Sequence, residues 1–407
     1  MTRIGFGYNQ KPEQSALIRT EATAHAIAVD DGELSRPREE PPASSTDEFA
    51  EWDSKETIDA VAAALSALGD VISLEANEDF PELLRDAKPD IVFNIAEGRY
   101  GVNRESHVPA ICEFYGIPYS GSDPLTLSLC LDKARAKETL SHHGIPTARF
   151  AVVRELSETT RALKALQLPL FVKPVHEGSS KGITERNFCR TAAELEAQVA
   201  FLIDAYDQPV IVEEYLPGAE FTCAVLGNGR TAKVLPIVGM NFASLPKGAL
   251  PIYGYEAKWI WDRPENPLQM FDCPAHIDPA LARAIERVTL DAYRVLGCRD
   301  WSRIDVRLDA AGEPNVVEVN PLPGILPDPA DNSCFPKAAR AAGMSYDELI
   351  QSCLKLAATR QGVPLGRQLR KMRTDSKTAS SQRAARAPRS RDSKGPVADS
   401  VANRLSA

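Results

Sequence analysis

Patterns typical of zinc-binding and disulfide-rich proteins are missing from this sequence of 407 residues. Its eight cysteines are scattered without a C-x-x-C pair, and its six histidines form no cluster. This argues against a zinc site and against a disulfide scaffold. No apolar run reaches about 18 residues, so we expect no membrane span. The chain starts in a short strand-like segment rather than the apolar core of a signal peptide, and the cytoplasm is the expected compartment.

The charge of the chain is unevenly distributed. Residues 366–407 contain eleven Lys and Arg against three Asp and Glu, a balance of +8; since the whole chain carries −9, residues 1–365 carry −17. An acidic body does not suit a nucleic-acid-binding domain, so any nucleic acid would be bound through the basic tail alone. The tail has few large apolar residues, and we expect it to be disordered.

The first part of the chain alternates between strand-like and helical segments. Three short apolar runs indicate buried strands: Ile4–Tyr8, Val71–Leu74 and Asp90–Asn94. Between them, Thr57–Leu68 has apolar residues at helical spacing and is followed by glycine. Strands that alternate with helices predict an α/β unit with a parallel sheet. The charged, proline-containing stretch Gln10–Trp52 is typical of a long loop.

The later part of the chain is richer in short strands and hairpin signals. The expected strands are Phe150–Val153, Leu170–Lys173, Val210–Glu214, Thr222–Leu226, Lys233–Val238, Trp301–Asp309 and Asn315–Asn320. The expected helices are Leu129–His142, Pro279–Leu296 and Ser345–Ala357. This mixture predicts an α+β region after the α/β unit.

Two of these strands carry a candidate metal site. Arg303 and Asp305 lie on one face of the first strand, and Glu318 and Asn320 on one face of the second, because side chains alternate along a strand. If the two strands pair in register, three oxygen ligands converge, which suits a hard cation such as Mg²⁺. A solvated hairpin is the commoner outcome of such alternation. Asparagine, however, is a poor strand former, and the rigid turn Pro321–Gly324 follows it.

Two further segments indicate a nucleotide site only when they are taken together. Lys173 ends a strand and precedes the loop His176–Gly182, whose glycines and serines could approach a phosphate. A flexible surface loop explains that segment alone at least as well. The strand and turn Ile211–Glu220 offers acidic and backbone groups for adenine and ribose, but an edge strand entering a turn has the same pattern.

The order of these motifs is more specific than any one of them. Lys133 is followed by Lys173 with E-G-S-S-x-G, and then by E-E-Y-L-x-G-x-E, Y-E-A-K, R-I-D-V and E-V-N-x-x-P-G. This order, from Tyr115 to Ile350, resembles the D-alanine–D-alanine ligase family of ATP-grasp enzymes. The resemblance implies an N-terminal α/β domain in residues 1–130, followed by ATP-grasp lobes in 131–217 and 218–365. It also implies amino-acid or short-peptide substrates, and a homodimer is common in the family.

The resemblance assigns expected roles to individual residues. A pair of Mg²⁺ ions, or Mn²⁺ in their place, would be bound by Asp305, Glu318 and Asn320. The residues implied to contact ATP are Lys133, Lys173, Ser180, Glu213, Tyr215, Leu216, Glu220 and Lys258. Arg303 and the backbone near Gly324 would stabilise an oxyanion. Ser333 would hold the carboxylate of the second substrate, and Ser179 would orient the attacking amine.

The sequence departs from the family where substrates bind. Gly5–Gln10 lacks the family's glutamate for the first substrate's amine, and Asn94–Glu105 replaces its H-G-x-x-G-E-D-G loop. Trp259 stands where the family has a tyrosine, and an indole cannot accept a hydrogen bond. We therefore expect altered substrates.

Within the replaced loop, Glu105 is a candidate substrate residue, and Arg99 and Arg104 suggest an extra substrate carboxylate. Asn241–Tyr253 is the candidate lid. Two other hypotheses are a genuine D-alanine–D-alanine ligase of cell-wall synthesis and a catalytically silent ATP-binding protein that recruits a partner through its tail.

Overall fold

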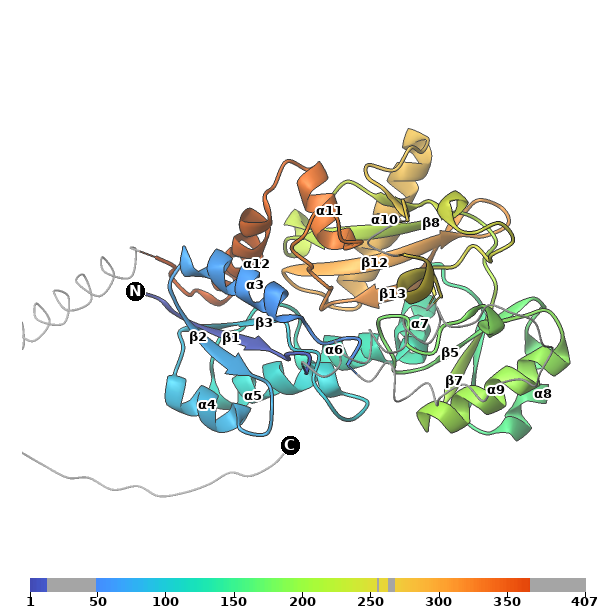
Figure 1. Ribbon diagram of the computed structural model, residues 1–407, viewed down its shortest axis with the longest axis horizontal. Coiled ribbons are helices and arrows are strands. Elements are labelled where there is room, and N and C mark those ends of the chain that lie inside the picture. The colour runs from blue at the N-terminus through green and yellow to red at the C-terminus, as the bar shows by residue number, and fades with distance from the viewer. Residues whose placement is uncertain (13–48, 255, 263–267, 367–407) are drawn as a thin grey trace, which may run out of the picture. The chain divides into compact units, whose positions relative to one another are not determined.

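Three β-sheets organise the described part of residues 1–365 in the computed structural model (Figure 1). The structure describes residues 1–12, 49–254, 256–262 and 268–366, without the side chains of 258–260. Nearly all of the predicted disordered tail, and most of the predicted loop Gln10–Trp52, lie outside these residues. Residues Met1–Leu365 cluster as one unit, and the internal boundaries expected at 130 and 217 stay a prediction.

The first sheet is parallel, with strand order β2-β1-β3, as the alternation of segments predicted. Its strands are β1 (Arg3–Tyr8), β2 (Asp70–Glu75) and β3 (Ile91–Asn94). The helices of this region are α3 (Lys55–Ser66), α4 (Phe80–Ala87), α5 (His107–Tyr115), α6 (Pro124–Leu131) and α7 (Lys133–His142).

The single helix expected over Leu129–His142 is in fact the end of α6 followed by α7. Asp132 separates them with an extended backbone, and its side chain accepts a hydrogen bond from the backbone N–H of Arg135. An aspartate in this position is a good N-cap, which favours a new helix start. The break places Lys133 in the first turn of α7.

The second sheet is antiparallel, with strand order β4-β7-β5-β6. Its strands are β4 (Phe150–Val153), β5 (Leu170–Pro174), β6 (Phe188–Cys189) and β7 (Val210–Glu214). Helices α8 (Thr159–Ala165) and α9 (Ala192–Tyr206) cover one face of it (Figure 1). Their buried side chains, such as Leu195 and Val199, pack with Val172 and Val212 of the sheet.

The third sheet contains the predicted metal hairpin. Its order is β11-β10-β8-β12-β13, with β9 paired to β8. The strands are β8 (Glu220–Leu226), β9 (Lys233–Val234), β10 (Val238–Met240), β11 (Phe271–Asp272), β12 (Trp301–Leu308) and β13 (Pro314–Asn320). The strand expected over Lys233–Val238 is interrupted because Pro236 lacks a backbone N–H for the ladder.

One face of this sheet is apolar and covered. Ile304 and Val306 of β12 form a buried cluster with Ile285 and Val288 of α10 (Pro279–Val295). Since side chains alternate, the polar residues of β12 lie on the opposite face. Helices α11 (Cys334–Ala341) and α12 (Tyr346–Gln361) complete the described chain. None of the described helices is long and apolar enough to cross a membrane.

The predicted fold class, a parallel α/β unit followed by α+β lobes, is confirmed by these three sheets.

Candidate active site

The hairpin of β12 and β13 brings the predicted metal ligands together. Arg303 lies opposite Asn320, and Asp305 lies opposite Glu318. The Asn320 side-chain nitrogen is 3.4 Å from Asp305 Oδ2. The pairing shifts directly after Asp305, leaving Val317 as an extra residue in β13. Such bulges often occur beside active sites, where they redirect side chains.

Asp305 is fixed from two sides. Arg303 Nη2 donates to Asp305 Oδ2 at 3.1 Å, and Thr222 Oγ1 donates to Asp305 Oδ1 at 2.9 Å. The described residues contain no group of three His, Cys, Asp or Glu side chains that could hold a metal. A cation here would therefore use two carboxylates and the amide oxygen of Asn320, an all-oxygen donor set that suits Mg²⁺.

Three lysines meet the acidic residues of the site. Lys133 Nζ is 2.8 Å from Glu318 Oε1, and Lys173 Nζ is 2.8 Å from Glu213 Oε2. Lys137, which sequence reasoning missed, lies 3.1 Å from the other Glu213 oxygen. Lys133 and Lys137 are one helical turn apart on α7, so both point to the same face. That spacing was the available sequence signal for Lys137.

These lysines keep both glutamates ionised. Burial alone would raise the pKa of Glu318, but Lys133 and then Lys173 hold that pKa at about 2. Burial also opposes ionisation of Glu213, yet Lys137 and Lys173 lower the pKa of Glu213 below its usual value. The site therefore combines fixed negative and positive charges at neutral pH.

The lowered pKa of Glu213 predicts an acid-dependent loss of stability. Because its pKa is lower in the folded state, ionised Glu213 stabilises the fold above its usual pKa of 4.5, and that contribution is lost as pH falls through the folded value. Replacing Glu213 with glutamine should lower the free energy of unfolding most at pH ~7 and least in acid. Urea unfolding of both proteins across this range measures the difference. A difference in the free energy of unfolding that grows as pH falls would contradict a lowered pKa for Glu213.

A cavity of about 130 Å³ lies beside this charged group. Its lining includes five of the eight residues expected to contact ATP, namely Lys173, Glu213, Tyr215, Leu216 and Glu220, and also the predicted metal ligand Glu318. It also includes Arg307, whose role sequence reasoning missed. Arg307 donates to Glu220 Oε2 and to the Tyr215 hydroxyl, both at 2.7 Å. Its position on the same strand face as Asp305 was the signal that could have found it.

The loop after β5 carries both predicted serines. Ser179 and Ser180 have φ values of 48° and 62°, a left-handed conformation that is uncommon outside glycine and often occurs at functional turns. Ser180 Oγ donates to the backbone oxygen of Tyr253 at 3.2 Å. The loop therefore contacts the end of the predicted lid Asn241–Tyr253.

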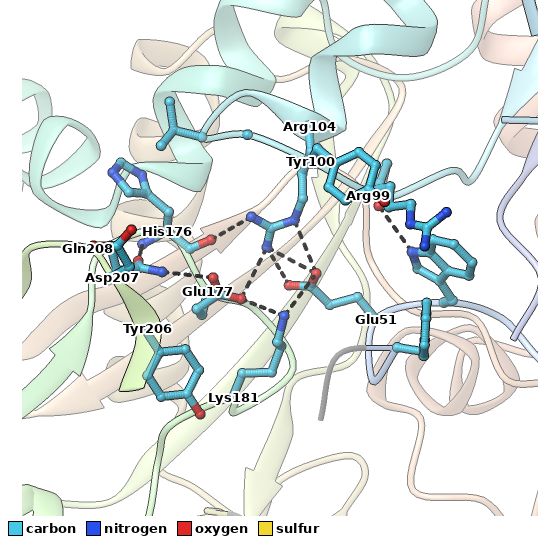
Figure 2. Close-up of a pocket in the computed structure, with 15 residues that line it drawn as sticks. Glu51, Arg99, Tyr100, Arg104, His176, Glu177, Lys181, Tyr206, Asp207 and Gln208 are labelled. Atoms are coloured by element: carbon cyan, nitrogen blue, oxygen red, sulfur yellow. Dashed lines mark hydrogen bonds and ion pairs between the residues drawn. The ribbon is translucent and has the colours of Figure 1, made fainter. Parts of the chain in front are cut away.

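Glu51 ties this loop to the N-terminal part of the chain (Figure 2). Its carboxylate accepts from the backbone N–H of Gly178 at 2.8 Å and from Arg104 Nη2 at 2.8 and 3.0 Å. Arg104 Nη1 donates to the backbone oxygen of His176 at 2.9 Å. The Glu51 and Arg104 side chains are 5% and 8% exposed. A Cβ at Gly178 would lie 2.6 Å from Glu51 Oε1, so a larger residue here would displace the Glu51 carboxylate.

Glu51 was not predicted, because the family's glutamate is expected directly after the first strand. Glu51 instead follows a long intervening segment and precedes α3. Nearby, burial and then the charge of Glu51 raise the pKa of Glu105 to about 8, and burial and then Glu105 raise the pKa of Glu97. Several acids therefore gather around Glu51.

The remaining predicted residues are only partly described. Ser333 is buried, and its hydroxyl donates to the backbone oxygen of Gly324 at 3.4 Å, so this predicted pair is adjacent. Arg99 is exposed. Lys258 and Trp259 lie in the helical turn Glu256–Trp261, but their side chains fall outside the described residues.

Comparison with known proteins identifies relatives of this chain. The profile of the family described as D-ala D-ala ligase C-terminus matches residues 139–355. The uncharacterized protein y4sG of Sinorhizobium fredii is 35% identical over 318 residues, which cover 76% of this chain and 89% of that protein. A D-alanine–D-alanine ligase of Cupriavidus taiwanensis is 36% identical over 268 residues, covering 66% of this chain and 76% of the relative.

Solved structures show the same fold. The crystal structure of a D-alanine–D-alanine ligase from Bacillus anthracis matches with a TM-score of 0.61 and 24% identity, covering 89% of this chain and 99% of that one. A second structure of the ligase from this organism, complexed with ATP, matches with a TM-score of 0.60 and 23% identity, covering 89% and 98%. At these identities the likeness supports the fold alone.

Proposed function

Since the chain belongs to the D-alanine–D-alanine ligase family of ATP-grasp, ADP-forming carbon–nitrogen ligases, we propose that it uses ATP to join the carboxylate of one amino acid or short peptide to the amine of another. The observation that carries the proposal is the register of β12 and β13. It sets Asp305 opposite Glu318 with Arg303 beside them. Lys133 of α7 forms an ion pair with Glu318.

ATP would occupy the cavity lined by Tyr215, Leu216 and Glu220. The backbone N–H of Tyr215 already donates to the backbone oxygen of Pro169 at 3.1 Å, so the Leu216 backbone is the better candidate for the edge of adenine. Glu220 would accept from the ribose hydroxyls. Lys133 and Lys173 would neutralise phosphate charge, and the roles of Ser180 and Lys258 at the phosphates stay a prediction.

The donor set of the hairpin fits Mg²⁺. Asp305, Glu318 and Asn320 would hold the ion, which when bound would offset negative charge on the transferring phosphoryl group. Glu318 is suited to this because its pKa of about 2 keeps it ionised. Thr222 and Arg303 hold the Asp305 carboxylate in a fixed orientation.

The residues account for a two-step reaction. A carboxylate oxygen of the first substrate attacks the γ-phosphorus of ATP and ADP leaves, which gives an acyl phosphate. The amine of the second substrate then attacks the acyl carbon and loses a proton, and phosphate departs with the former carboxylate oxygen. Arg303 and the backbone near Gly324 would stabilise the oxyanion. Ser333 would hold the second substrate's carboxylate, and Ser179 would orient its amine.

We further propose that the substrates differ from a pair of D-alanines. Arg104 and Glu51 form a buried ion pair against the loop that carries Ser179. Burial and neighbouring acids raise the pKa values of Glu97 and Glu105, and the ammonium of the first substrate would favour their ionised form. A genuine D-alanine–D-alanine ligase is the second candidate, favoured by the names of several relatives, including the one from Cupriavidus taiwanensis.

An ADP-release assay with D- and L-amino acids, singly and in pairs, tests the proposal. We expect ADP formation that depends on both a donor and an acceptor, with a pair other than D-alanine preferred. Equal or better turnover of D-alanine would favour the second candidate. Tight ATP binding without turnover of any pair would instead indicate a catalytically silent nucleotide-binding protein.

Replacing Glu220 with glutamine tests the ATP site separately. The change removes the charge that pairs with Arg307 and weakens one ribose contact, so KM for ATP should rise about tenfold, equivalent to one charged hydrogen bond. Steady-state kinetics with ATP varied gives this value. The exposed Glu313→Gln variant on the β12–β13 turn should leave KM unchanged, and an equal change in both variants would contradict the assignment.

A further inference from the structure

A second and larger cavity, of about 330 Å³, is lined in part by His176, Glu177 and Lys181 of the loop that carries Ser179 (Figure 2). It shares no lining residue with the proposed ATP cavity. Its walls come from four segments: 49–52, 98–104, 176–181 and 206–208. Small-molecule sites begin at about this size, ~300 Å³. The cavity is therefore large enough for an amino-acid side chain or a short peptide.

Contacts of Lys133 connect this cavity to the proposed reaction centre. Lys133 Nζ pairs with Glu318 of the metal hairpin and also donates to the backbone oxygen of Glu177. The side chain of Glu177 lines the cavity. Lys133 and the backbone at Glu177 therefore lie between the cavity and Glu318. A substrate whose reacting carboxylate lies near Glu318 could extend into it.

The charged groups at the centre of the cavity neutralise one another. Arg104 pairs with Glu51 at 2.8 Å and with Glu177 at 3.6 Å. Lys181 pairs with Glu177 at 2.6 Å. Figure 2 shows these four side chains as one connected network. Arg104 is therefore engaged within the protein, and the extra-carboxylate role expected for both Arg99 and Arg104 is better suited to Arg99.

Arg99 is the cation of the cavity that pairs with no carboxylate among the described residues. Its guanidinium lies 4.8 Å from the centre of the Tyr100 ring. Stacking on a ring leaves the N–H edges of a guanidinium free, and these edges bind a carboxylate in a two-pronged geometry. Asp207 lies across the cavity from Arg99 (Figure 2), so a carboxylate is favoured only at the Arg99 end.

We propose that this cavity is the specificity subsite for the first substrate, and that it takes an amino acid with a second carboxylate, which Arg99 binds. The inference rests on the proposed ligase function. The body of the substrate would pass between Trp52 and Tyr206, which also line the cavity. The network of ion pairs among Glu51, Arg104, Glu177 and Lys181 would keep the shape of the subsite constant.

Matched donors test this subsite in the full chain. ADP release is measured with alanine as acceptor and with glutamate against glutamine, and aspartate against asparagine, as donors in both enantiomers. We expect kcat/KM to favour the acid of one pair by at least about tenfold, because one charged hydrogen bond accounts for that factor. The Arg99→Gln variant should reduce the ratio to near one while leaving the amide donor unaffected. Arg99→Lys should keep part of the preference.

The exposed Arg85→Gln variant on α4 is the matched control and should keep the wild-type ratio. An unchanged ratio in Arg99→Gln, or an equal loss with acid and amide, would overturn the subsite. Turnover of neutral donors without any acid preference would also overturn it while leaving the ligase function intact. Absence of donor-dependent ADP release, with ATP still bound, would overturn both.

Discussion

Replacing Glu318 with glutamine is expected to lower kcat for amide-bond formation by about 10³-fold, since a bound cation supplies several kcal/mol of charge stabilisation and each ~1.4 kcal/mol is tenfold. Glu318 is ionised at neutral pH because Lys133 holds its pKa at about 2 against the effect of burial. The glutamine side chain would keep the shape of the glutamate and one oxygen that accepts a hydrogen bond from Lys133. It would remove one of the two carboxylates that face each other across β12 and β13.

The Glu313→Gln variant is the control for this loss, because it changes the same residue type in the exposed turn of the same hairpin. It should retain full activity. Titration of Mg²⁺ with ATP present should show weakened ion binding in Glu318→Gln alone. A loss of kcat smaller than about tenfold, with normal ion binding, would show that Glu318 does not belong to the metal site.

Replacing Glu51 with alanine is expected to have the largest effect on stability. Breaking a buried ion pair by removing one partner costs about 3–5 kcal/mol, because the remaining charge stays buried. Arg104 keeps a longer contact with Glu177 at 3.6 Å, so we expect about 3 kcal/mol, the lower end of that range. Gly178 would also lose the acceptor of its N–H, which should loosen the Ser179 loop and lower kcat/KM for the first substrate.

Denaturant unfolding and steady-state kinetics measure the two effects of Glu51→Ala. Glu51→Gln, which keeps an acceptor for Gly178, should fall between wild type and alanine in both. Glu56→Ala, in the exposed first turn of α3, should change stability by no more than about 0.5 kcal/mol. If Glu51→Ala unfolded at the wild-type denaturant concentration, the ion pair would not hold the loop as described.

The convergence of Asp305 and Glu318 on one hairpin could be predicted from sequence because its signal is local. Alternation with a period of two puts Asp305 on one face of its strand, and an asparagine before a proline-rich turn is unusual enough to draw attention. The order of the motifs likewise predicted five residues that line one cavity. The bulge at Val317 could not be predicted, because it depends on how two strands pair and not on either strand alone.

Residues held by distant contacts were harder to find. Glu51 meets Gly178 across 127 positions of sequence, and no local pattern indicates such a contact. Lys137 and Arg307 had usable signals, since each shares a face with a predicted site residue, but face sharing alone does not distinguish a binding group from a solvated one. The break between α6 and α7 depended on one capping aspartate, which the helical periodicity of the flanking segments concealed.

The most direct test of the proposed reaction follows the oxygen atoms of the first substrate. A donor amino acid with isotopically heavy oxygen in its reacting carboxylate is turned over with ATP and an acceptor, and the inorganic phosphate is analysed by mass spectrometry. An acyl-phosphate route predicts transfer of a heavy oxygen to phosphate with each amide bond formed, together with ADP. Amide formation with unlabelled phosphate, or with AMP and pyrophosphate as products, would contradict the account.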